Sequence, residues 1–230
     1  MTFEAAQRLT EVLVALAVLQ QAVEHLVVPA RDRSWFVIQT VLALAVADGT
    51  APVVSLGALL LVSAATVQHF RGPYNGGSDR MRLLVLSCLW LSHVARNPAW
   101  AHVALGYLAV QVVLSYTMAG WVKLANPDWR RGRALQDVFA FSVYPVSEDL
   151  RTWADAPRTL HAFSWMAITF ELLFPLALVN TTALVVALCL ALLFHVVNAC
   201  TFGLNRFVWI WVAGYPCLLW FQRDMIALIR

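Results

Sequence analysis

Long, nearly continuous apolar stretches are the feature that most restricts how this chain can fold. The clearest runs over 100–124, slightly longer than the ~20 residues that a helix needs to cross a bilayer. Hydrophobic residues make up 61% of the chain and charged residues 13%, whereas soluble domains carry about 25% charged residues. Apolar and polar positions do not alternate, which excludes the strands of a membrane β-barrel. We therefore predict an all-α, polytopic transmembrane helical bundle.

The apolar stretches divide the chain into seven or eight membrane segments, at 10–29, 35–47, 53–70, 81–96, 100–124, 160–179, 183–201 and 207–221. The count stays open because 35–47 is short for a span, so it is either a tilted span or a re-entrant segment. Residues 125–158 form the longest polar interval. Their aromatic side chains lie among charges, which is typical of helices and loops along the membrane interface. We expect one transmembrane domain over 1–230 and no separate soluble domain.

Composition also argues against several functions. The formal charge of +3 comes from arginine-rich loops, which in a membrane protein indicate topology and not nucleic-acid binding. The four cysteines form no C-x-x-C pair, so no metal site is expected. No inverted repeat of the kind found in transporters is visible. The positive-inside rule places the loop that follows Lys123 in the cytoplasm.

Several ionisable residues fall inside apolar stretches, where a charge costs about 2.5–3.5 kcal/mol on insertion scales. For any one of them, the simplest interpretation is a buried polar group that ties helices together by hydrogen bonds. Several in one small bundle favour a shared polar pocket. The residues concerned are Glu24, His25, His93, Lys123, Glu171 and His195.

Regular spacing places some of these residues on helix faces that we expect to point into the bundle. Gln111, Ser115, Ala119 and Lys123 recur every four residues and therefore form one stripe on one helix face. Ser115 and Ala119 are small enough to admit a neighbouring helix closely. On later segments, Glu171 shares a face with His161 and Ser164, and His195 shares one with Asn198.

Lys123 is the only lysine in the chain, and every other residue among its sixteen lysines and arginines is arginine. An arginine would anchor a helix at the headgroups equally well. Arginine, however, does not lose its proton in proteins, whereas a desolvated lysine does so readily. The lone lysine thus indicates a base or nucleophile, although an interfacial lysine with no chemical role fits the same residue.

The stretch YTMAGWVKLANPDWRRGRAL at 116–135 resembles the HTTM family, a membrane domain shared with the vitamin K-dependent γ-carboxylases. The shared pattern is an aromatic-rich span ending in A-G-x-x-K-L, then D-W, then a glycine before an interfacial helix. Here it comprises Ala119, Gly120, Lys123, Leu124, Asp128, Trp129 and Gly132. The strings FELLFP at 170–175, FHVVNACTFGLNRF at 194–207 and NGGSD at 75–79 also resemble family segments.

In the carboxylases, the lysine that matches Lys123 deprotonates reduced vitamin K. Oxygen then converts this quinol to an epoxide and generates a strong base, which removes the γ-proton of a peptide glutamate before carbon dioxide adds. The resemblance implies that Lys123 is such a base, with a reduced quinone, O2 and CO2 as co-reactants. We expect the pocket around it to include Gln111, Ser115, Asp128, Trp129, Glu171, His195 and Asn198, with loop contributions from Asn75 and Asp79.

Two features depart from the carboxylases. The chain leaves no room for their large lumenal domain, and the turn at 75–79 lacks their supporting histidine. Their lysine also faces the lumen, opposite to the side that the charge count gives. Small family members resemble a membrane protein of bacterial sporulation-delaying toxin operons, which acts in peptide maturation. This likeness implies a bacterial cytoplasmic membrane and a small peptide or a neighbouring redox protein as partner.

Two hypotheses follow. In the first, the chain is a carboxylase- or epoxidase-like membrane enzyme that uses Lys123 on a quinol-like, apolar or peptide substrate. In the second, it is a non-catalytic membrane partner, or a maturation or immunity protein for a secreted peptide. In that case, Lys123 pairs with a carboxylate such as Asp128 or Glu171 and holds helices together.

Overall fold

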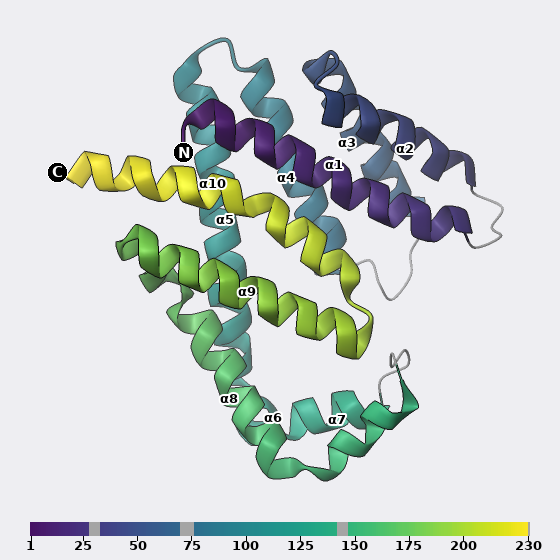
Figure 1. The fold of residues 1–230 in the computed structure, drawn as a ribbon, viewed down its shortest axis with the longest axis vertical. Helices are drawn as coiled ribbons and strands as arrows, with labels where there is room; N and C mark the ends of the chain where they lie inside the picture. The colour runs from purple at the N-terminus through teal and green to yellow at the C-terminus, as the bar shows by residue number, and fades with distance from the viewer. Residues whose placement is uncertain (28–32, 70–75, 142–146, 230) are drawn as a thin grey trace. The chain divides into compact units, whose positions relative to one another are not determined.

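The computed structural model describes residues 1–27, 33–69, 76–141 and 147–229, and these residues contain helices and turns but no strand. In chain order the helices are α1 (Phe3–Val27), α2 (Arg33–Asp48), α3 (Pro52–His69), α4 (Gly77–Val94), α5 (Pro98–Ala125), α6 (Pro127–Arg130), α7 (Arg133–Phe141), the 3-10 helix η1 (Glu148–Asp155), α8 (Pro157–Leu173), the 3-10 helix η2 (Phe174–Val179), α9 (Thr181–Phe202) and α10 (Asn205–Ile229) (Figure 1). The all-α prediction is confirmed.

Within the described ranges, five helical segments are long and apolar enough to cross a membrane: Phe3–Val27, Pro52–His69, Pro98–Ala125, Pro157–Val179 and Thr181–Phe202. Two of the other predicted segments differ from these for identifiable reasons. Helix α2 has only 16 residues, which at 1.5 Å per residue span about 24 Å. Helix α4 carries Asp79, Arg80 and Arg82 near its start. A count of seven or eight spans therefore stays a prediction.

The described chain divides into two compact units, one formed by 1–110 with 206–230 and the other by 111–205. Helix α5 supplies residues to both. The expectation of a single domain over 1–230 stays a prediction.

Unit 1, formed by 1–110 and 206–230, is built from helices that pack on their sequence neighbours. Helix α1 packs on α2, α2 on α3, and α3 on α4. Helix α10 runs antiparallel to α1: Thr10 in the first half of α1 contacts Cys217 in the middle of α10, and Glu24 near the end of α1 contacts Arg206 at the start of α10 (Figure 1). Its core is aliphatic, with side chains fully or almost fully buried at Val14, Val18, Leu56, Leu59, Leu86, Leu89 and Leu218.

Unit 2, formed by 111–205, pairs the second half of α5 with α8 in antiparallel fashion. On α5, Tyr116 stacks on Phe174, which directly follows α8, and seven residues later Lys123 contacts Glu171 within α8, so positions rise on one helix as they fall on the other. Helix α9 follows after Asn180, whose side chain accepts a hydrogen bond from the Ala183 amide and caps the helix.

The described part of the predicted interfacial region, 125–158, contains three short elements, α6, α7 and η1. Asn126 caps α6 and Pro127 occupies its first turn. Phe139 on α7 stacks on Trp153 of η1, with 5.9 Å between ring centroids. Phe141 and Trp153 nevertheless expose much of their area. Such exposed aromatics suit a membrane interface, and the location of this region at the interface stays a prediction.

Candidate functional site

Gly120 brings the backbones of α5 and α8 together. A Cβ atom placed on Gly120 would lie 2.9 Å from the Cβ of Glu171 and 2.9 Å from the backbone nitrogen of Leu172. Real Cβ contacts essentially never fall below 3.0 Å. Any side chain at this position would therefore separate the helices. The glycine sets Glu171 directly beside the last turns of α5, where Lys123 lies.

Lys123 and Glu171 form a two-point ion pair. The Lys123 Nζ lies 2.8 Å from Oε1 and 2.7 Å from Oε2 of the carboxylate. The Glu171 side chain is 4% exposed and the Lys123 side chain 18% exposed. Removing one member of a buried pair costs about 3–5 kcal/mol, because the other charge is left without a partner. Each residue therefore depends on the other for its place in the bundle.

Trp129 covers the same ammonium group. Its ring centroid lies 5.3 Å from the Lys123 Nζ, within the range of a cation–π contact. The short helix α6 that carries Trp129 is tied to α8 by two side-chain hydrogen bonds. The Ser164 hydroxyl donates to the Trp129 carbonyl, and the Trp165 indole donates to the Arg130 carbonyl. The ammonium is thus held between a carboxylate and an aromatic face.

A second polar pair lies on α5 two turns before Lys123. The Tyr116 hydroxyl is 2.9 Å from the Nε2 of His195 on α9, and both residues are buried. Tyr116 also stacks on Phe174 with 4.2 Å between centroids, and it meets the edge of Phe170 at 6.0 Å. Phe170 in turn contacts Phe194. These rings form an aromatic cluster on the same face of α5 as the ion pair.

Tyr116 was missed at the level of sequence, although the signal was present. It lies seven residues before Lys123, which places it on the same helix face. The predicted stripe instead followed steps of four through Ser115. In the structure, Val112, Tyr116 and Gly120 are buried, whereas Gln111, Ser115 and Ala119 are only half-buried. Ser115 donates its hydroxyl to the Val112 carbonyl at 2.7 Å.

The remaining predicted residues have other surroundings. Asp128 is exposed, and its backbone amide donates to the capping side chain of Asn126. Asn198 is half-buried near the end of α9, and its carbonyl accepts from the Gly203 amide. Asp79 belongs to unit 1 and forms an ion pair with Arg82 at 3.2 Å. Asn75 lies outside the described residues.

The site offers proton transfer and aromatic stacking. No group of three or more histidine, cysteine, aspartate or glutamate side chains that could hold a metal ion occurs in the described ranges. A reduced quinone is a planar ring with two hydroxyl groups, and the cluster of Tyr116, Phe170, Phe174 and Phe194 provides aromatic faces and edges of the kind such rings pack against. The residue types near Lys123 are therefore compatible with such a molecule.

The described residues form helices, and several of these are apolar and long enough to cross a bilayer, so the chain is an integral membrane protein. A family model described as the HTTM domain matches residues 89–224, which is more than half of the chain. The chain therefore belongs to the HTTM family, a membrane-associated, carboxylase-like family. The match begins inside α4, ends inside α10 and includes all of unit 2. No curated protein and no solved structure matches the chain.

Proposed function

We propose that this chain is a carboxylase-like membrane enzyme in which Lys123 acts as a base on a quinol-like, apolar or peptide substrate. The observation that carries the proposal is the ion pair of the only lysine with the buried Glu171. Membership of the HTTM family supports it. A bacterial cytoplasmic membrane is the proposed location, and a small peptide or a neighbouring redox protein is the proposed partner.

The pair supplies a route to a neutral amine. A proton passes from the Lys123 Nζ to a Glu171 oxygen, which converts an ammonium and a carboxylate into an amine and a carboxylic acid. Burial favours the neutral forms because charges are expensive in an apolar medium. The amine then accepts the proton of a substrate hydroxyl, which leaves an oxyanion next to the new ammonium. Glu171 thus holds the proton that Lys123 must release first.

The aromatic cluster gives the substrate its orientation in this proposal. A reduced quinone would supply an oxidisable ring when bound, and Phe170 and Phe194, the two half-buried rings of the cluster, would pack against that ring. The hydrogen bond between Tyr116 and His195 fixes the tyrosine ring in place. Trp129 keeps water from one side of the ammonium.

An assay with a reduced 1,4-naphthoquinone in air tests the proposal. The purified protein in lipid vesicles is expected to convert the quinol to its 2,3-epoxide, consuming one O2 and releasing one water per turnover, as measured by mass spectrometry. Lys123→Arg is expected to abolish turnover while the thermal unfolding midpoint changes little. Arginine can pair with Glu171 through two hydrogen bonds, but it does not release its proton.

A second substitution serves as the control. Arg133→Lys exchanges the same two residue types at an exposed position, 3.9 Å from Asp137, and is expected to leave turnover unchanged. Full activity of Lys123→Arg would contradict the assignment of the base. If the wild-type protein oxidises neither naphthoquinols nor benzoquinols, the quinol part of the proposal is wrong.

We propose as a second function a non-catalytic partner for the maturation of, or immunity to, a secreted peptide, and the bidentate geometry supports the structural role that the ion pair has in it. Here the pair is a structural cross-link, as its two short contacts and the low exposure of Glu171 permit. Exchanging both residues for apolar ones, in Lys123→Met with Glu171→Leu, is then expected to preserve folding. If a small secreted peptide co-purifies with the wild-type chain, the double variant should retain it. An enzyme would lose its activity in the same variant.

A further inference from the structure

A buried arginine in unit 1 lacks hydrogen-bond partners for part of its guanidinium group. Arg82 on α4 is 3% exposed. One of its terminal nitrogens donates to the Gln21 side chain and the other lies 3.2 Å from Asp79, yet its Nε has no hydrogen-bond partner in the described ranges. A buried donor without an acceptor costs about 1–3 kcal/mol, and more when it is charged. The Nε of Arg82 therefore needs a hydrogen-bond acceptor that the described residues do not supply.

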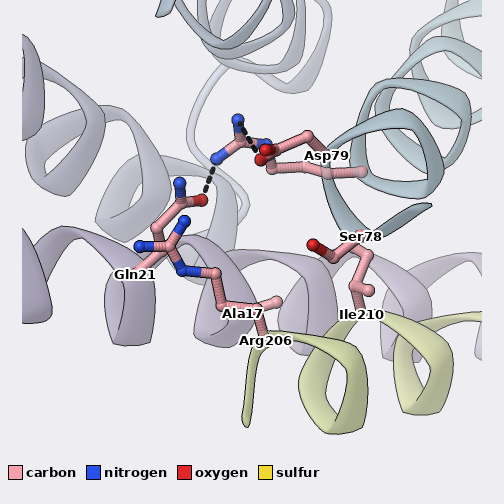
Figure 2. Close-up of a pocket in the computed structure, with 7 residues that line it drawn as sticks. Ala17, Gln21, Ser78, Asp79, Arg206 and Ile210 are labelled. Carbon is pink, nitrogen blue, oxygen red and sulfur yellow. Dashed lines mark hydrogen bonds and ion pairs between the residues drawn. The ribbon is translucent and has the colours of Figure 1, made fainter. Parts of the chain in front are cut away.

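A small cavity lies beside this arginine. It is lined by Gln21 from α1, by Ser78, Asp79 and Arg82 from α4, and by Arg206 from α10. Figure 2 shows Gln21, Ser78, Asp79 and Arg206 around one space between these helices. The cavity measures about 10 Å³, about the space that one water molecule needs, so a halide ion, which is somewhat larger, would displace the lining side chains slightly.

The charges around the cavity leave a positive excess. Arg82 is balanced by Asp79, and Arg206 is balanced by Glu24, which accepts from its Nε at 3.1 Å. Helices α4 and α10 both begin here, since Ser78 and Arg206 belong to their first turns. Each helix N-terminus carries roughly half a positive elementary charge. The two together add about one positive charge, which these two ion pairs do not offset.

From these observations we infer that the cavity is a binding site for a monovalent anion of halide size, such as chloride. The anion accepts from the Nε of Arg82 and from the Ser78 hydroxyl, and it joins the N-terminal turns of α4 and α10 to α1. A water molecule would satisfy the donors but would leave the positive excess in place. The inference is independent of the role of Lys123.

Thermal unfolding in exchanged salts tests this inference. The full chain, purified in detergent in sodium gluconate, is titrated with sodium chloride or bromide at constant ionic strength. The unfolding midpoint is expected to rise saturably with either halide. Ser78→Ala is expected to raise the half-saturating halide concentration about tenfold or more, because a hydrogen bond to a charged group is lost. Ser63→Ala is the matched control, since Ser63 is also buried in unit 1 but does not line the cavity.

A diffraction measurement locates the anion without any substitution. Crystals grown in bromide are expected to show an anomalous peak within hydrogen-bonding distance of the Arg82 Nε. A midpoint that does not depend on halide, together with no anomalous peak, would mean that water fills the cavity and would overturn the inference. An equal halide response in Ser78→Ala and the wild type would also overturn it, because the anion would then bind elsewhere.

Discussion

At the scale of single residues, the sequence identified the two charges of the candidate site but not the contact that joins them. Lys123 stood out because it is the only lysine, and Glu171 because it lies inside an apolar stretch. Two partners, Asp128 and Glu171, remained open for the lysine. Only packing decides between them, since Asp128 on α6 is exposed while Glu171 on α8 is buried against α5. A local pattern does not contain that long-range information.

Gly120 gives a prediction at this scale. Gly120→Ala adds a methyl group that must displace Glu171 and the backbone of α8, so we expect a destabilisation of about 1–3 kcal/mol and a weakened ion pair. Gly106→Ala on the same helix is the control, because its new Cβ would lie 3.6 Å from the Phe221 ring, an ordinary contact. There the better helix propensity of alanine should stabilise the protein by up to about 1 kcal/mol. Chemical unfolding in mixed micelles measures the change in stability of both variants. Equal changes would mean that α5 and α8 do not approach unusually closely at Gly120.

At the scale of helices and turns, the sequence predicted the bounds of helices closely where apolar stretches end at turn residues. The stretch predicted at 100–124 became α5 (Pro98–Ala125), between the proline at one end and Asn126 at the other. The stretch predicted at 160–179 forms α8 and then η2, and Pro175 lies in the first turn of η2. Proline lacks the amide proton that an α-helix requires, which accounts for a change to 3-10 geometry near it. Hydropathy alone does not report such a change inside a span.

Gly132, between α6 and α7, provides the prediction at this scale. It has a φ of +78°, and a Cβ there would lie 2.7 Å from the Cα of His161 on α8. Both Gly132→Ala and Gly132→Asn should detach α6 and α7 from α8, and Trp129 with them. Asparagine tolerates the left-handed backbone, but its Cβ meets the same His161 backbone. We expect faster amide hydrogen exchange over 127–141 in both variants.

Gly203, which follows α9, distinguishes the effect of left-handed backbone geometry from the effect of a steric contact such as the one with His161. Gly203 has a φ of +68°, but a Cβ added to it would meet no atom within 4 Å. Gly203→Asn should therefore be nearly neutral, and Gly203→Ala should cost about 1 kcal/mol through backbone strain alone. If Gly132→Asn proved as harmless as Gly203→Asn, the contact with His161 would not restrain the turn.

At the scale of the whole molecule, composition was sufficient for the class of protein but not for the number of crossings. Each of the five segments that meet the length and hydropathy conditions contains a window of 18 residues with at most two charged residues. The other three predicted segments, α2, α4 and α10, carry polar groups that contact other residues of the chain. Arg82 of α4, for example, is buried in contact with Gln21 and Asp79. A hydropathy sum counts a paired arginine as fully as one that faces lipid, so it underestimates how readily such a helix enters a bilayer.

The two ends of the chain give a test of the count. An even number of crossings places both ends on one side of the membrane, whereas an odd number places them on opposite sides. We expect eight crossings, with α2, α4 and α10 included, because internal pairing offsets the charges of α4. Alkaline phosphatase and green fluorescent protein fusions before Met1 and after Arg230 report the side of each end. Fusions after Asp48 then test α2 separately, since a re-entrant α2 would return that position to the side of Arg33 and leave seven crossings with the ends on opposite sides.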